Sequence, residues 1–254
     1  MINLDIYDYA EYPKKEDWLE ICKDKVDSIN KLSFNISPRT FDILNNRIAH
    51  FGIELNYQLK EFNNRAFDLI TNYTMLKAYY EKGIPDDEWY APSEESKARI
   101  QYFPQFEEKH YANLYWFSFY SESYYTRFFG LIDSLYHLVN TKYKFEIEPK
   151  LGFINKVLKK LEVADKGLYD YLKALPDNNV YKKVSEFRNN LVHNFRPNQI
   201  DSGITTEVLP DGRTSISVSV GRYTTSNEFL ENIHDSLDLL ADIIDNTKDK
   251  LEGE

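Results

Sequence analysis

The spacing of apolar residues along the chain predicts a protein built mainly from helices. Apolar positions recur at three- and four-residue intervals over 14–32, 41–80 and 105–140, as on a helix with one buried face. The run at 41–80 is consistent with one long helix or with a pair of helices kinked at Gly52. The run at 105–140 is so rich in aromatic residues that we expect it to be buried between several other helices.

Proline and glycine mark where these helices begin and end. Ser37-Pro38 is suited to a helix start, with an N-cap followed by proline at the first helical position. Residues 84–104 hold three prolines among many charges, which predicts a loop with at most a short helix. We therefore expect an N-terminal helical extension over 1–104, packed on a main helical domain over 105–254.

The second half of the chain predicts shorter helices at 149–162, 165–175 and 179–195. After them the pattern changes to an alternation of apolar and polar residues around a Pro-Asp-Gly turn, which predicts a β-hairpin at about 203–221. Thr225-Ser226-Asn227-Glu228 then has the form of a capping box that opens a last amphipathic helix. The predicted fold class is all-α: a helical bundle with one inserted β-hairpin before the C-terminal helix.

The composition and the first residues indicate where the protein is located. Cys22 is the single cysteine of the 254 residues, so no intrachain disulfide can form. The first residues lack the basic and apolar regions of a signal peptide, and no stretch approaches the ~18 apolar residues of a membrane span. We therefore expect a cytoplasmic protein without a membrane partner.

The net charge of −10 argues against indiscriminate binding of nucleic acid, but the charge is unevenly spread. Residues 142–196 hold 12 Lys/Arg against 7 Asp/Glu, a local net of +5. Residues 201–254 hold 4 against 12, a local net of −8. A polyanion such as RNA should thus prefer the region 142–196.

The helix predicted at 179–195 carries the most informative polar residues. At about 100° per residue, Asn189 and His193 share a polar stripe with Arg188 beside it. The core stripe of the same helix comprises Val180, Val184, Phe187, Leu191 and Phe195, and the polar stripe also holds Lys182 and Glu186. His193 is therefore predicted on the surface. Two explanations without a functional role compete with a functional site here. A histidine in the last turn of a helix interacts favourably with the helix dipole, and Lys182 with Glu186 could be a solvated ion pair.

The segment Arg188-Asn189-Asn190-Leu191-Val192-His193 resembles the motif of the HEPN superfamily, which is an arginine, usually a polar residue after it, and a histidine four to six residues on. In that family the motif lies on a late helix of a helical bundle, the position predicted here. The resemblance covers about 105–254. It implies metal-independent cleavage of RNA without a cofactor, and motif helices paired across a homodimer.

The residue types fit the chemistry that this resemblance implies. A histidine can exchange a proton near neutral pH, and an arginine can stabilise charge on phosphoryl oxygens. The expected catalytic residues are thus Arg188, Asn189 and His193, with Asn189 orienting the phosphate or the imidazole. The expected partners are RNA, a second copy bound through the Arg188/His193 face, and an antitoxin of unknown kind. The expected roles are toxin–antitoxin, antiphage or RNA-processing functions.

Two other functions remain open at this point. A HEPN module without catalysis would bind RNA, nucleotide or a protein partner, and a helical interaction scaffold would carry the motif by chance. Other candidate sites are weaker. His137 with Asp133, and His234 with Asp238, lack further metal ligands at suitable spacing. Acids at 86–88 suit a solvated loop, and aromatic residues at 111–129 suit a core better than a base-stacking surface.

Overall fold

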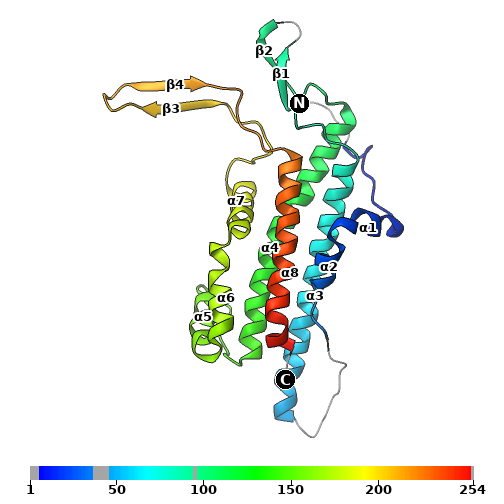
Figure 1. The fold of residues 1–254 in the computed structure, drawn as a ribbon, viewed down its shortest axis with the longest axis vertical. Coiled ribbons are helices and arrows are strands. Elements are labelled where there is room, and N and C mark those ends of the chain that lie inside the picture. Colours follow the sequence, from blue (N-terminus) through cyan, green and yellow to red (C-terminus); the bar gives the residue numbers. More distant parts are fainter. Residues whose placement is uncertain (1–5, 37–45, 94–95, 253–254) are drawn as a thin grey trace.

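The computed structural model describes residues 6–36, 46–93 and 96–252, and these form a mostly helical fold with two small hairpins (Figure 1). The described helices are α1 (Lys15–Ile21), α2 (Val26–Lys31), α3 (Asn46–Glu81), α4 (Glu108–Lys142), α5 (Phe153–Ala164), α6 (Lys166–Ala174), α7 (Asn179–His193) and α8 (Ser226–Glu252). The strands are β1 (Tyr90–Ser93), β2 (Ser96–Tyr102), β3 (Ile204–Val208) and β4 (Thr214–Val218), each sheet being one antiparallel pair. None of these helices is long and apolar enough to cross a membrane.

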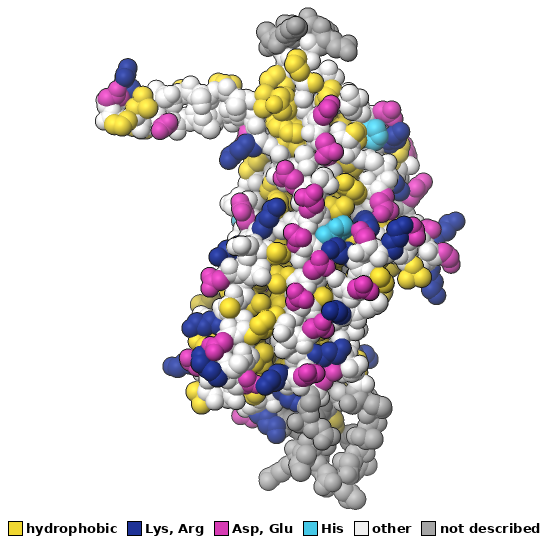
Figure 2. All heavy atoms as spheres, in the orientation of Figure 1, with side chains coloured by type: hydrophobic (Ala, Val, Ile, Leu, Met, Phe, Trp, Pro, Cys, Tyr) yellow, Lys and Arg dark blue, Asp and Glu magenta, His cyan; other side chains and the backbone are white. Residues whose placement is uncertain are grey.

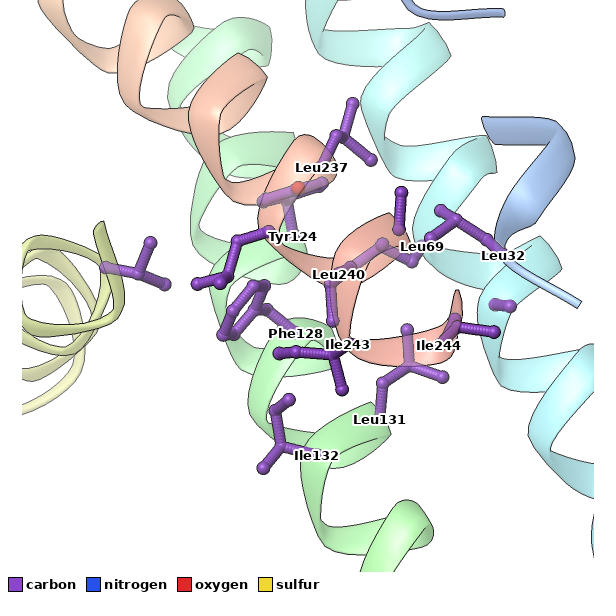
Figure 3. Packing of buried hydrophobic residues seen from close by; sticks show 14 of the residues in the cluster. Leu32, Leu69, Tyr124, Phe128, Leu131, Ile132, Leu237, Leu240, Ile243 and Ile244 are labelled. Carbon is purple, nitrogen blue, oxygen red and sulfur yellow. The ribbon is translucent and has the colours of Figure 1, made fainter. Parts of the chain in front are cut away.

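Three long helices, α3, α4 and α8, lie side by side and form the core (Figure 1). The antiparallel contact of α3 with α4 is the most extensive between helices in the described chain. Figure 3 shows Tyr124 and Phe128 of α4 packed against Leu237 and Leu240 of α8, with Leu69 of α3 beside them. The aromatic-rich helix is thus buried between neighbours, as its pattern predicts.

The short helices α5, α6 and α7 cover one flank of α4 (Figure 1). Asp165 caps α6 by accepting a hydrogen bond from the Leu168 N–H at 3.0 Å. Asn178 caps α7 by accepting from the N–H groups of Val180 and Tyr181 at 2.8 and 3.2 Å. These side chains fix where both helices start, which sets the register of α7 on the bundle.

The N-terminal segment is held against α3 and α8 by charged and polar side chains. Lys25 pairs with Asp238 of α8 at 2.7 Å, and the buried Lys77 of α3 bonds to Asp24. Cys22 packs beside Thr74, and burial raises the pKa of its thiol, so it is not activated as a nucleophile. The division of the chain at residue 104 remains a prediction.

The predicted helices agree with the structure in order, but the one predicted at 14–32 is divided into α1 and α2 by a 3₁₀ turn at Lys23–Lys25, and two others differ at their edges. The described part of the run at 41–80 forms one helix from Asn46 that continues through Gly52, while Ser37-Pro38 and residues 41–45 lie outside the described residues. The helix predicted to reach 195 ends at His193, and Phe195 is therefore 57% exposed, not in the core. The last helix begins as predicted, because the Thr225 hydroxyl accepts from the Glu228 N–H at 3.3 Å.

The predicted loop at 84–104 instead contains the hairpin β1–β2. Aromatic side chains in and beside this hairpin pack together. The ring of Trp89 stacks on that of Tyr102 with 6.2 Å between the ring centres, and its centre lies 5.6 Å from that of Tyr223, far along the chain. Pro92 faces Ile100 in a two-stranded sheet, where each strand is an edge that tolerates proline. The second hairpin, β3–β4, falls where the alternation predicts it.

Candidate active site at the end of α7

The buried face of α7 positions the motif. Phe187, which precedes Arg188, lies in the core with its ring centre 5.7 Å from that of Tyr125 and 4.6 Å from that of Phe229. Val184 and Leu191 are buried one turn to either side. This anchoring leaves the opposite face of the last two turns at the surface.

The structure brings Arg188, Asn189 and His193 together. Nη1 of Arg188 donates a hydrogen bond to Oδ1 of Asn189 at 3.0 Å and lies 3.2 Å from Nε2 of His193. Asn189 and His193 are exposed, and Arg188 is half-buried. The arginine thus bridges the amide and the imidazole, and the exposure of Asn189 and His193 leaves the cluster accessible from outside the bundle.

The contact between Arg188 and His193 is a hydrogen bond only in one tautomer of the histidine. A guanidinium is always a donor, so in that bond Nε2 is the acceptor, with its lone pair directed at Arg188, and the imidazole proton is on Nδ1. An anion that draws the guanidinium away would free that lone pair.

Arg188 has hydrogen-bonding capacity left over. Its Nε is buried and makes no hydrogen bond with any described residue. A buried unpaired donor is costly, so the guanidinium gains from an additional acceptor. A phosphate oxygen is the type of acceptor that arginine binds with the most favourable geometry.

Asp133 of α4 lies near this motif, which no spacing in the sequence indicates. Partial burial raises the pKa of Asp133, against the opposing fields of His137, Arg188 and Arg65. Arg188 therefore lies within electrostatic range of a carboxylate on α4. The signal was absent from the sequence, because only the packing of α4 against α7 relates these two residues.

A groove of about 910 Å³ runs along α4 and is bounded by the segment that follows α7. Arg196 in this segment pairs with Glu122 of α4 at 3.1 Å, and Asn198 donates to the Ser118 hydroxyl at 2.6 Å. The groove exposes Tyr115 and Phe119, so part of the aromatic run at 111–129 faces outward. The prediction that this run belongs to the core is thus correct for its inner face only.

The other two candidate histidines make packing and hydrogen-bond contacts with neighbouring side chains of the fold. His137 stacks on Phe153 at 4.5 Å, and His234 shares a 3.1 Å hydrogen bond with Tyr73. Burial lowers the pKa of His234, which Asp24 partly opposes. Asp238 bonds to Lys25 and Ser28 of the N-terminal segment. The described residues contain no group of three His, Cys, Asp or Glu side chains arranged to hold a metal ion.

One carboxylate expected in a solvated loop is buried. Asp86 is 1% exposed and accepts hydrogen bonds from the Tyr223 hydroxyl at 2.7 Å and from the Ser226 N–H and hydroxyl at 2.8 and 2.7 Å. It ties the end of α3 to the start of α8. The partners lie about 140 residues further along the chain, so no local pattern indicates this role.

With this geometry in view, a comparison with protein families identifies the fold. The model of the Cthe2314-like HEPN family matches residues 59–252, well over half of the chain. The chain belongs to this HEPN family, in which RNase activity is frequent. The match begins within α3 and includes α7 with its Arg188–His193 segment. No curated protein and no solved structure matched the chain.

Proposed function

We propose that this protein is a metal-independent endoribonuclease whose catalytic residues are Arg188, Asn189 and His193. The observation that carries the proposal is the cluster at the exposed end of α7, where one guanidinium nitrogen touches both the amide and the imidazole. Membership of a HEPN family supports the same reading. The reaction needs a base, a phosphate-binding cation and open access, and the cluster supplies these.

The chemistry proceeds without a metal. The phosphate of the RNA draws the Arg188 guanidinium away from His193, which frees Nε2 as the base. Nε2 takes the proton of a ribose 2′-hydroxyl as its oxygen bonds to the adjacent phosphorus. The bond to the 5′-oxygen breaks, and that oxygen receives a proton. The products are a 2′,3′-cyclic phosphate and a 5′-hydroxyl, while Arg188 and Asn189 hold the charged phosphoryl oxygens.

The leaving oxygen needs an acid while His193 is still acting as the base. A second copy of the chain, paired through the Arg188/His193 face, would supply a second His193 in the protonated form. Val192 supports such pairing, since it is 41% exposed beside the cluster. We therefore propose a homodimer with a composite cleft. Toxin–antitoxin, antiphage or RNA-processing roles, and an antitoxin partner, are the settings that suit such an enzyme.

The test is cleavage of a fluorescent mixed-sequence RNA in EDTA. We expect the wild type to cut, and His193→Ala and Arg188→Ala to lose at least a hundredfold in rate, because general base and charge stabilisation each contribute about that much. Arg188→Lys should recover little, since an ammonium lacks the planar fork with which a guanidinium bonds to two phosphate oxygens at once. Lys182→Ala is the matched control, an exposed cation near the start of α7.

Each outcome decides between the functions. Cutting lost in both alanine variants and kept in Lys182→Ala supports the nuclease. RNA binding without cutting by the wild type selects a non-catalytic module. No binding and no cutting leaves the interaction scaffold. Cutting that survives both alanine substitutions contradicts the assignment of the catalytic residues.

A further inference from the structure

The hairpin β3–β4 has one apolar and one polar face. Residues directly opposite one another share a face, and the pairs Ile204–Val218, Thr206–Ile216 and Val208–Thr214 form the apolar one. The other face carries Thr205, Ser217, Glu207 and Ser215. All ten strand residues are exposed, with Ile216 at 67% and Val218 at 77%. We call this hairpin the arm.

The arm has no partner among the described residues. Figure 1 shows it projecting from the top of the bundle beyond α7, and the space-filling view in Figure 2 shows it standing clear of the rest of the molecule. A single two-stranded hairpin is marginally stable in water at best, and it gains independent stability by packing its apolar face on another element. Four exposed valines and isoleucines on one face form an apolar patch, and such patches commonly bind a partner.

The root of the arm is braced, so its direction is fixed. Asp201 accepts from the backbone N–H and from Nε of Arg222, at 3.0 and 2.9 Å, which joins the two sides of the root. Gly203 has φ +63°, and a Cβ there would lie 2.2 Å from the carbonyl oxygen of Ser219. The two chains of the root are thus packed at contact distance. The root is tied to the body where Asn198 donates to the Ser118 hydroxyl of α4 at 2.6 Å and the Thr224 N–H donates to the Pro197 carbonyl at 2.8 Å.

The groove along α4 matches the apolar face of the arm in character and in length. Its residues from Tyr111 to Arg127 span about 24 Å of helix, and a five-residue strand is about 17 Å long. Tyr115 and Phe119 are 47% and 53% exposed within it. Ile200 lines the same groove immediately before the root of the arm, so each arm leaves the body at the rim of its own groove.

We propose that the arm lays its apolar face in the α4 groove of a second copy of this chain, and receives that copy's arm in return. A two-fold axis makes both contacts at once, because the same chain carries the arm and the groove. The second copy is the occupant that this geometry favours, since the braced root directs the arm away from its own groove. The inference rests on the homodimer of the proposed function and adds the element that holds it together.

The test is a disulfide between two differently tagged chains, both carrying Cys22→Ala. One chain carries Ile216→Cys on the apolar face of the arm, and the other carries Phe119→Cys in the groove. The matched control replaces Ile216→Cys by Ser217→Cys, one residue along on the polar face. We expect a mixed-tag disulfide band at least fivefold stronger from position 216 than from position 217.

A second measurement uses light scattering on the full chain. The wild type should have the mass of a dimer, Ile216→Asp that of a monomer, and Ser217→Asp that of a dimer. A monomeric wild type, equal bands from both arm positions, or no band at position 216 overturns the proposal. So does a disulfide within one chain that carries both Ile216→Cys and Phe119→Cys.

The proposal for the arm and the proposal of nuclease activity can be refuted independently. A dimeric wild type whose RNA cleavage is lost in His193→Ala, but which gives no disulfide band from position 216, would keep the active site and overturn the arm. The position-specific disulfide in a protein that never cuts RNA would keep the arm and overturn the nuclease.

Discussion

Replacing Asp86 by alanine should destabilise the whole fold, although the residue lies in a segment rich in proline and charge. The carboxylate accepts three hydrogen bonds, from the Tyr223 hydroxyl and from the N–H and hydroxyl of Ser226. Ser226 is the first residue of α8, so the carboxylate also meets the positive end of that helix. Asp86 thereby joins the segment after α3 to the segment that opens α8, about 140 residues further along the chain.

The magnitude follows from these contacts. A hydrogen bond to a charged group contributes about 1.5–3 kcal/mol, and the cost of burying the carboxylate offsets part of the total. That cost is visible in the pKa of Asp86, which burial raises. Asp86→Ala leaves three donors without their acceptor, and each buried group left unsatisfied costs about 1–3 kcal/mol, so we expect the free energy of unfolding to fall by about 4 kcal/mol. In a chain of this size that lowers Tm by about 8–16 °C.

The assay is urea unfolding followed by circular dichroism, with Asp87→Ala as the matched control on the exposed neighbour. Asp87→Ala should stay within about 0.5 kcal/mol of the wild type. Tyr223→Phe should cost about 1.5 kcal/mol in the wild type and much less in Asp86→Ala, since its bond is already absent there. A loss below about 1 kcal/mol for Asp86→Ala would refute the reasoning.

Three further predictions concern the support of α7, the N-terminal interface and the arm. Phe187→Ala should lower stability by about 3 kcal/mol and reduce RNA cleavage, because it removes the ring that anchors the motif helix; full activity would contradict this. Burial lowers the pKa of His234, so the folded state binds fewer protons than the unfolded one below about pH 6.5, and stability should fall as the pH drops through that value. His234→Gln should flatten this dependence in urea titrations, and an unchanged slope would count against it. Gly203→Ala should weaken the root of the arm, because a Cβ meets the Ser219 carbonyl; unchanged hydrogen exchange in the hairpin would speak against this.

Local signals in the sequence were enough for the helices and for the second hairpin. Asn178 and Thr225 are caps whose partners lie two or three residues away, so their roles can be read from the chain alone. The motif could be read in part, since Asn189 and His193 are one helical turn apart. The contact of Arg188 with His193 spans five residues, about 140° around the helix, and depends on the reach of the long arginine side chain. What they do in catalysis remains a proposal.

Features that depend on distant segments could not be read in this way. The hairpin β1–β2 is supported by packing of Trp89 on Tyr223, and Asp86 finds its partners in the same later segment. Asp133 enters the surroundings of Arg188 only because α7 packs on α4. Periodicity reports which face of an element is buried, not which other element covers it.

The most direct test of the central claim uses a DNA oligonucleotide with a single ribonucleotide, incubated with the protein in EDTA. A wild-type protein that acts through His193 should cut only after that ribose and leave a 2′,3′-cyclic phosphate and a 5′-hydroxyl, both identifiable by mass. His193→Ala should leave the oligonucleotide intact over the same time. Cutting of the all-deoxy strand, a 5′-phosphate product, or equal cutting by His193→Ala would contradict the account.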